Sequence, residues 1–200
     1  MPVIRVRCLL SLLSVVVCCD AYSVELIAHR GYTCRATENT LAAVSDAWRA
    51  KADGVELDLR VSRDGVIVVY HDETIGRRRI STMTYAEINV ATDIDVPTLQ
   101  SVLNRDAPRG YYVLDLKESS PERYRTLATV IRRSSIPPNR ILIQGENVAV
   151  LTTLKSELPG ATFHFLTRLT RRFPTFRIPS ADAVLTEMAK AKLDGVTLKG

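Results

Sequence analysis

The sequence predicts an α/β protein of the (β/α)₈ or TIM-barrel type, with about seven strands present and the eighth missing. Apolar, strand-like runs alternate with helix-like patterns along the chain, and this alternation is typical of βαβ units and a parallel sheet. Polar residues gather where the expected strands end, which is where such barrels carry their functional groups. A length of 200 residues, with 46% hydrophobic and 24% charged residues, fits one ordinary globular domain.

The first 23 residues are predicted to be a signal peptide that does not belong to the domain, which we place at residues 24–200. Arg5 and Arg7 precede an apolar stretch, residues 9–17, that is too short to span a membrane. Small side chains at Ala21 and Ser23 favour cleavage after Ser23. We therefore expect an exported protein, periplasmic or secreted, without stable membrane insertion. Because only Cys34 of the four cysteines lies beyond this segment, no disulfide is expected within the domain.

The elements follow one another in a regular order along the rest of the chain. The expected strands are residues 24–29, 55–61, 66–71, 111–117, 140–144, 162–167 and 195–199. The expected helices are residues 39–51, 98–104, 121–134, 147–157 and 180–192. Pro97 and Pro121 stand at positions where helices commonly begin. The domain is shorter than the roughly 250 residues of a typical barrel, and its last expected strand is the seventh.

Two carboxylates share one face of the second strand. In the stretch GVELDLRVS, apolar residues alternate with Glu56 and Asp58, and side chains two apart on a strand point the same way. Neighbouring carboxylates repel each other unless a cation lies between them, and Ca²⁺ or Mg²⁺ prefers such oxygen ligands. The alternative is an edge strand with one solvated face.

The strand YYVLDL places Asp115 and Lys117 together on the face opposite its leucines. A third carboxylate beside a fixed positive charge suits a metal-bound phosphate, although an Asp-x-Lys pair is often a surface ion pair. Two of the three histidines, His29 and His71, end expected strands on the same rim. This placement indicates a general acid and a general base, with Asp72 orienting the ring of His71. His164 is interpreted as a core or lining residue.

Five linked motifs resemble the glycerophosphodiester phosphodiesterase family in order and spacing, from about Glu25 to Gly195. The motifs are His29-Arg30-Gly31, Glu38-Asn39-Thr40, Glu56-Leu57-Asp58, His71-Asp72 and the stretch VPTLQSVL at residues 96–103. The resemblance implies a TIM-barrel hydrolase that converts a glycerophosphodiester and water into glycerol 3-phosphate and an alcohol. It also implies that the family's eighth strand has no counterpart here, as in a chain truncated at its C-terminus.

The resemblance also implies roles for single residues. These are His29 and His71 as the acid–base pair, Arg30 and Lys117 as phosphate-binding groups, and Glu56, Asp58 and Asp115 as ligands of a divalent metal, Ca²⁺ or Mg²⁺. Asp115 stands where the family usually has a glutamate, so its carboxylate reaches one methylene less far. Glu38, Asn39 and Thr40 are expected to shape the loop before the first helix rather than to take part in chemistry.

Charge and composition limit the partners. The net charge of +5 is dispersed, with few aromatic residues among the basic clusters, so we expect a small anionic substrate and no nucleic acid. One alternative is a lipid phosphodiesterase, such as a phospholipase or a sphingomyelinase D-like enzyme, which needs an apolar docking rim. Another is a non-catalytic barrel that binds phosphate ligands. A purely structural barrel leaves the coincidence of histidines and carboxylates unexplained.

Overall fold

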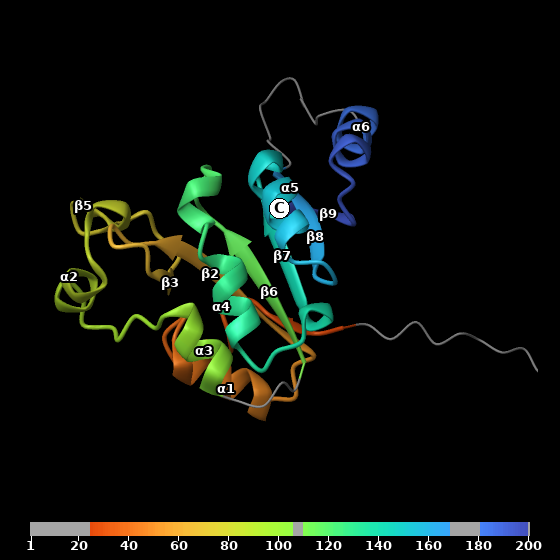
Figure 1. Ribbon diagram of the computed structural model, residues 1–200. Helices are drawn as coiled ribbons and strands as arrows, with labels where there is room; N and C mark the ends of the chain where they lie inside the picture. Colours follow the sequence, from red (N-terminus) through yellow and green to blue (C-terminus); the bar gives the residue numbers. More distant parts are fainter. Residues whose placement is uncertain (1–24, 106–109, 169–180, 200) are drawn as a thin grey trace, which may run out of the picture.

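The computed structural model describes residues 25–105, 110–168 and 181–199, and these form a curled, largely parallel sheet with helices packed against it (Figure 1). The strand order is β1-β2-β6-β7-β8-β9, and β3 pairs with β2 at the side of this path. The strands are β1 Ile27–Ala28, β2 Gly54–Val61, β3 Ile67–Val69, β6 Tyr111–Leu116, β7 Ile141–Gly145, β8 Thr162–Arg168 and β9 Gly195–Lys199. In the described residues the curl stays open, so the predicted incomplete barrel is confirmed.

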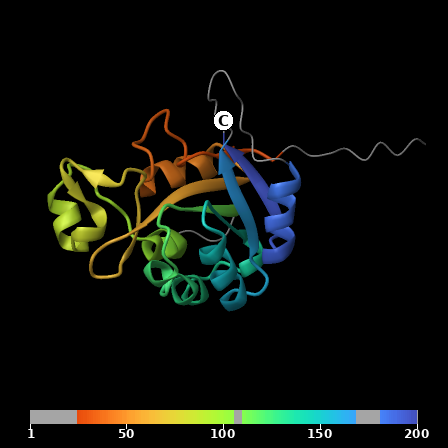
Figure 2. The ribbon, with the colours of Figure 1, turned by 90° about the horizontal axis from the view of Figure 1, so that it is seen from above.

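The helices follow the strands as the sequence predicts, and several of them line one side of the sheet (Figure 2). They are α1 Leu41–Arg49, α3 Leu99–Arg105, α4 Leu127–Arg133, α5 Val148–Glu157 and α6 Ala181–Ala191. Local sequence fixes where two of them begin: the side chain of Thr40 accepts a hydrogen bond from the Ala43 amide, and that of Asn147 accepts one from Val150. The expected helix at 121–134 is instead a 3₁₀ turn, Pro121–Tyr124, followed by α4.

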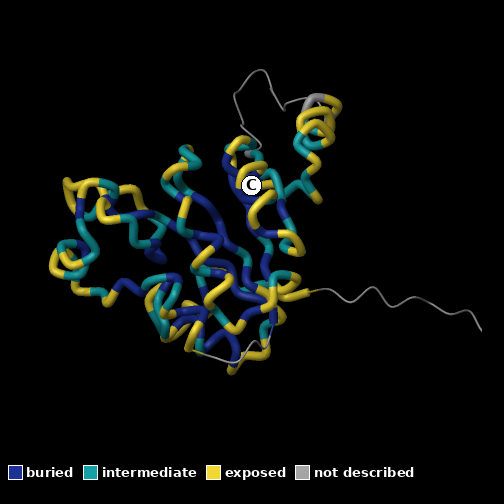
Figure 3. The backbone as a smooth tube through the Cα atoms, in the orientation of Figure 1, coloured by how far each residue is buried: buried dark blue, intermediate teal, exposed yellow. Residues whose placement is uncertain are grey.

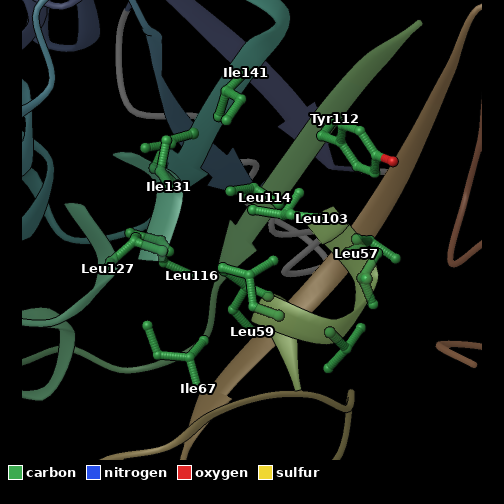
Figure 4. Packing of buried hydrophobic residues seen from close by; sticks show 14 of the residues in the cluster. Leu57, Leu59, Ile67, Leu103, Tyr112, Leu114, Leu116, Leu127, Ile131 and Ile141 are labelled. Atoms are coloured by element: carbon green, nitrogen blue, oxygen red, sulfur yellow. The ribbon is translucent and has the colours of Figure 1, made fainter. Parts of the chain in front are cut away.

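Alternation along the strands separates the core from the inner face. Leu57 of β2 faces Leu114 of β6 in the sheet register, and both are fully buried in the main apolar cluster between the sheet and its helices (Figure 4). The intervening residues Glu56 and Asp58 point to the opposite face. Figure 3 shows the same division, with buried strands inside and exposed positions on the helices and loops.

One strand runs differently from the sequence-based expectation. Residues 66–71 were expected to continue the alternation of parallel strands, but β3 pairs antiparallel with β2, with Val61 opposite Ile67. The connection between the two strands, residues 62–66, is far shorter than the dozen or so residues that a parallel crossover needs. The seven strands of the sheet therefore include one hairpin strand among the parallel ones.

A small lobe follows β3 that the sequence did not reveal (Figure 1). It contains β4 Thr74–Ile75, β5 Arg78–Arg79, a 3₁₀ turn Ile80–Thr82 and α2 Tyr85–Val90. A second apolar cluster holds it together, formed by Val68, Ile80, Met83, Ile88 and Val96. Along the chain, the lobe lies between His71 and the start of α3.

The predicted signal peptide, residues 1–23, lies outside the described residues. Among the helices that the structure does describe, none is both long and apolar enough to cross a bilayer. Cys34 is an exposed free thiol.

Candidate active site

Three carboxylates meet at the carboxyl ends of β2 and β6. Asp58 and Asp115 are register partners on neighbouring parallel strands, and Glu56 lies two residues before Asp58 on the same face. All three are buried, with 6% of Glu56, 0% of Asp58 and 4% of Asp115 exposed. One oxygen from each lies within 4.8 Å of the others, so the predicted cluster forms.

The charges within this cluster shape its protonation. Burial, together with the negative charge of Asp58, raises the pKa of Glu56 to about 7. Burial would also raise the pKa of Asp58, but hydrogen bonds from Lys117 and Asn39 outweigh that effect and lower it. The ammonium of Lys117 lies 2.8 Å from Asp58 Oδ1 and also contacts Asp115. Although burial disfavours its charge, these two carboxylates raise the pKa of Lys117, so Lys117 stays a cation.

The donor set fits a hard divalent cation. Three carboxylates close together supply the oxygen ligands that Ca²⁺ and Mg²⁺ prefer. Without added positive charge, the high pKa of Glu56 leaves it partly protonated near neutral pH, and a cation would favour its ionised form. Glu56, Asp58 and Asp115 are therefore suited to hold a metal ion.

Arg30 joins the loop after β1 to two of these carboxylates. Its backbone N–H donates to Glu56 Oε2 at 3.0 Å, and its guanidinium Nε lies 3.2 Å from Asp58 Oδ2. Nη1 also bonds to both carboxylate oxygens of Glu38, at 2.9 and 3.0 Å. Arg30 adopts φ +58° and Gly31 φ +84°, so the backbone turns sharply here. A Cβ on Gly31 would lie 2.7 Å from the carbonyl carbon of Ala43, which only glycine avoids.

The two rim histidines occupy different surroundings. The side chain of His29 is 71% exposed, and its Nε2 lies 3.8 Å from Glu56 Oε2, beside the carboxylate cluster. The side chain of His71 is 32% exposed, and its Nδ1 lies 2.8 Å from Asp72 Oδ1, as the sequence suggested. A small pocket beside His71 is lined in part by Glu38, Asn39 and Tyr70. The ring of His29 is therefore accessible from solution, and Asp72 fixes the orientation of the ring of His71.

A larger pocket of about 370 Å³ opens next to the cluster. The residues that line it include Asp115, Lys117, Arg60, Glu118, Glu146 and Asn147. The pocket therefore adjoins the carboxylates at the end of β6 and continues over the ends of β2 and β7. Its lining carries both signs of charge, with Arg60 and Lys117 among the cations and Asp115, Glu118 and Glu146 as the carboxylates.

Comparison with known proteins agrees with this arrangement. A model of the glycerophosphoryl diester phosphodiesterase family matches residues 29–193. The chain belongs to this family. The match begins at His29 and contains all seven residues to which the resemblance assigned roles.

Individual relatives share parts of the chain. It is 33% identical over 111 residues to the uncharacterized protein YqiK of Bacillus subtilis, covering 48% of this chain and 46% of that protein. It is 28% identical over 133 residues to lysophospholipase D GDPD3 of mouse (56% and 40%). It is 27% identical over 168 residues to a glycerophosphodiester phosphodiesterase of Bacillus subtilis (66% and 57%). The matched region thus spans between about two fifths and three fifths of these relatives.

Solved structures support the fold. The phosphodiesterase from Thermotoga maritima superposes with a TM-score of 0.70 at 23% identity, covering 88% of this chain and 74% of that one. A phosphodiesterase from Oleispira antarctica, solved with the product sn-glycerol-3-phosphate, gives a TM-score of 0.72 at 22% identity with the same coverages. At these identities the likeness shows a shared fold.

Asn39 is a site residue whose role the sequence reasoning missed. It was expected only to shape the loop, yet it is 3% exposed and forms hydrogen bonds with Asp58 of the cluster. Its Nδ2 donates to Asp58 Oδ2 at 2.8 Å, and its Oδ1 accepts from the Asp58 amide at 3.2 Å. Its φ is +58°, a left-handed conformation that asparagine tolerates better than most residues. The family motif Glu38-Asn39-Thr40 was the available signal, but the partner of Asn39 is distant in sequence.

A row of polar side chains extends from the cluster across the inner face. Asp115 is in register with Gln144 of β7, and Gln144 with His164 of β8. Gln144, which is 7% exposed, was not singled out in the sequence. The Nδ1 of His164 lies 3.2 Å from Thr197 Oγ1, and burial lowers the pKa of its ring. His164 thus lies on the same face of the sheet as Asp115 and Gln144.

Proposed function

We propose that the protein hydrolyses glycerophosphodiesters to glycerol 3-phosphate and an alcohol, using a divalent cation, Ca²⁺ or Mg²⁺. The observation that carries this proposal is the buried cluster of Glu56, Asp58 and Asp115, bordered by two cationic side chains and two rim histidines. Membership of the family and the fold shared with phosphodiesterases support it. The pattern of the first 23 residues supports export to the periplasm or the medium.

The side chains divide the work of binding. Glu56, Asp58 and Asp115 would hold the cation, which when bound supplies Lewis-acid stabilisation and orientation of the phosphodiester. Arg30 and Lys117 add fixed positive charge beside the same carboxylates, where the negative charge of the phosphoryl group is greatest. Because buried carboxylates hold the side chains of Arg30 and Lys117, these two groups need little rearrangement as the reaction proceeds.

The two histidines exchange protons with the substrate. One removes a proton from the nucleophile, either water or the neighbouring glycerol hydroxyl, and the other protonates the leaving alkoxide. If the glycerol hydroxyl attacks, a cyclic phosphate forms and water opens it in a second step. Asp72 binds Nδ1 of His71, which leaves Nε2 of that ring to give or accept the proton.

The direct experiment measures glycerol 3-phosphate released from glycerophosphocholine by the purified protein. Release should require Ca²⁺ or Mg²⁺ and stop on addition of EDTA. His29→Ala and His71→Ala should each lower kcat by at least 100-fold while keeping the thermal unfolding temperature. If both variants hydrolyse the substrate normally, the acid–base assignment is wrong. A folded, metal-binding protein that is stabilised by glycerophosphocholine without releasing product would instead be a phosphate-ligand binder.

Metal binding is tested separately by calorimetric titration. Asp58→Asn should weaken Ca²⁺ or Mg²⁺ binding by at least tenfold, because it removes a charged ligand. Asp93→Asn makes the same chemical change on an exposed loop residue and should leave binding unchanged. Equal binding by the wild type and both variants would contradict the assigned metal site.

A further inference from the structure

Arg60 is a nearly buried cation on the inner face of β2. It lies two residues after Asp58 and shares its face, and only 12% of its side chain is exposed. Its Nε donates to the backbone carbonyl oxygen of His71 at 2.9 Å, and its Nη1 lies 3.7 Å from Glu118 Oε1. The guanidinium therefore connects the ends of β2 and β6 to the segment that carries a rim histidine.

The segment around His71 depends on such contacts for its position. β3 is only three residues long and ends at Val69, so His71 lies beyond the regular pairing of the hairpin. The backbone N–H of Tyr70 donates to the carbonyl of Asp58 at 2.9 Å, and Arg60 holds the carbonyl of His71. Both anchors belong to β2, the strand that also carries Glu56. A single strand thus sets the distance between the histidine and the carboxylate cluster.

Glu118 is in turn held by a buried tyrosine. The hydroxyl of Tyr124 accepts hydrogen bonds from the amides of Lys117 and Glu118, at 2.9 and 3.1 Å, and donates to the carbonyl of Leu59 at 2.8 Å. Tyr124 is 0% exposed, and burial raises the pKa of its phenol, so the hydroxyl keeps its proton. The backbone that presents Glu118 is therefore fixed.

We propose that Arg60, oriented by Glu118, is a positioning residue that holds His71 at the distance from the carboxylate cluster that proton transfer requires. This inference rests on the proposed function, in which His71 exchanges a proton with the substrate. An arginine suits the role because its planar guanidinium offers Nε to one partner and Nη1 to another in a fixed geometry. A displacement of a reacting group by about 1 Å can lower a rate by about 100-fold.

The first test compares Arg60→Gln with Arg63→Gln. Arg63 lies three residues further on and is paired with Glu87 on the surface, so its variant controls for the loss of a positive charge. Arg60→Gln should lower kcat about 10- to 100-fold and change KM by less than about threefold, while Arg63→Gln should leave both near the wild-type values. Glu118→Gln should lower kcat in the same way but less. A rise in KM at constant kcat would overturn the proposal, because it would place Arg60 on the substrate.

The second test asks whether Arg60 acts through His71. The substrate is the p-nitrophenyl ester of glycerol 3-phosphate, whose good leaving group keeps slow rates measurable. Adding Arg60→Gln to His71→Ala should lower kcat by less than about twofold relative to His71→Ala alone. Losses that multiply in the double variant would show that Arg60 acts independently of the histidine and would overturn the inference.

A third readout does not need activity, so it separates this inference from the proposed function. In ¹H–¹³C NMR spectra, where the chain has three histidines, Arg60→Gln should shift or broaden the ring signals of His71 and Arg63→Gln should not. Unchanged His71 signals in a folded Arg60→Gln protein would refute positioning even if the wild type proved inactive. A wild type without activity, but with the expected NMR change, would refute the proposed function alone.

Discussion

The free energy of unfolding should depend on pH in a way that reports the buried carboxylate of Glu56. Burial and the charge of Asp58 raise its pKa from 4.5 to about 7. The folded protein therefore binds this proton more tightly than the unfolded chain, and stability falls as pH rises between these two values. At about 1.4 kcal/mol for each pH unit of that interval, the metal-free protein loses roughly 3 kcal/mol by pH 8.

The perturbation is Glu56→Gln, which keeps the shape of the side chain and removes its titration. We expect urea denaturation in EDTA to show the wild type losing about 2.5 kcal/mol more than the variant between pH 5 and pH 8. Asp58, whose pKa is lowered from 3.8, is ionised at both pH values. The lowered pKa of His164 acts in the opposite direction, favouring the folded state as pH rises, but it does so equally in both proteins.

A divalent cation should offset the loss of folding stability that ionised Glu56 causes at high pH. At pH 8, saturating Ca²⁺ or Mg²⁺ should raise the stability of the wild type well above that of Glu56→Gln, because the ion binds only the folded cluster. The same pH dependence in wild type and variant would refute the reasoning, since Glu56 would then not be a buried carboxylate with a raised pKa. Equal stabilisation of both proteins by the cation would exclude Glu56 as a ligand.

Substitutions at three further positions test the structure around the cluster. Asn39→Ala should lower the free energy of unfolding by about 2–4 kcal/mol, because it removes two hydrogen bonds to Asp58 and strains a backbone at φ +58°. Asn39→Gly should recover the part due to strain, and equal losses would show that strain is absent. Tyr124→Phe should cost about 1–3 kcal/mol in urea denaturation and lower kcat, since it releases the backbone behind Lys117; an unchanged stability would contradict the buried hydrogen bonds. Gly31→Ala should destabilise the protein by at least about 2 kcal/mol, as its Cβ would meet Ala43 at 2.7 Å, and a thermal midpoint equal to the wild type would count against this turn.

The acidic cluster was predictable because it depends on local periodicity. Alternation along β2 puts Glu56 and Asp58 on one face whatever the rest of the chain does. The placement of Asp115 beside them followed from a parallel sheet, in which strand ends meet at one edge. The same argument placed His29 at the rim. His71 lies beside β2 for a different reason: β3 runs antiparallel, so the hairpin returns the chain along β2 until the Tyr70 N–H bonds to the Asp58 carbonyl.

The antiparallel pairing of β3 and the small lobe after it were not predicted. The apolar run at residues 66–71 looks the same whether it pairs parallel or antiparallel, and only the short connection to β2 distinguishes the two. The lobe depends on a cluster in which Val68 meets Ile80 and Val96. These residues are far apart in the sequence, and no short periodic pattern links them.

By itself, the sequence determined the family and the order of the main parallel strands and their helices, and it named the seven residues to which the proposal assigns chemistry, because each depends on motifs or on periodicities of a few residues. Only the tertiary structure decided what holds those residues in place. Asn39 binds Asp58 across 19 positions, and Arg60 binds the carbonyl of His71 across 11. Such contacts depend on how the chain returns to the same rim, and side-chain direction there is set by the packed neighbours of each residue rather than by its own identity.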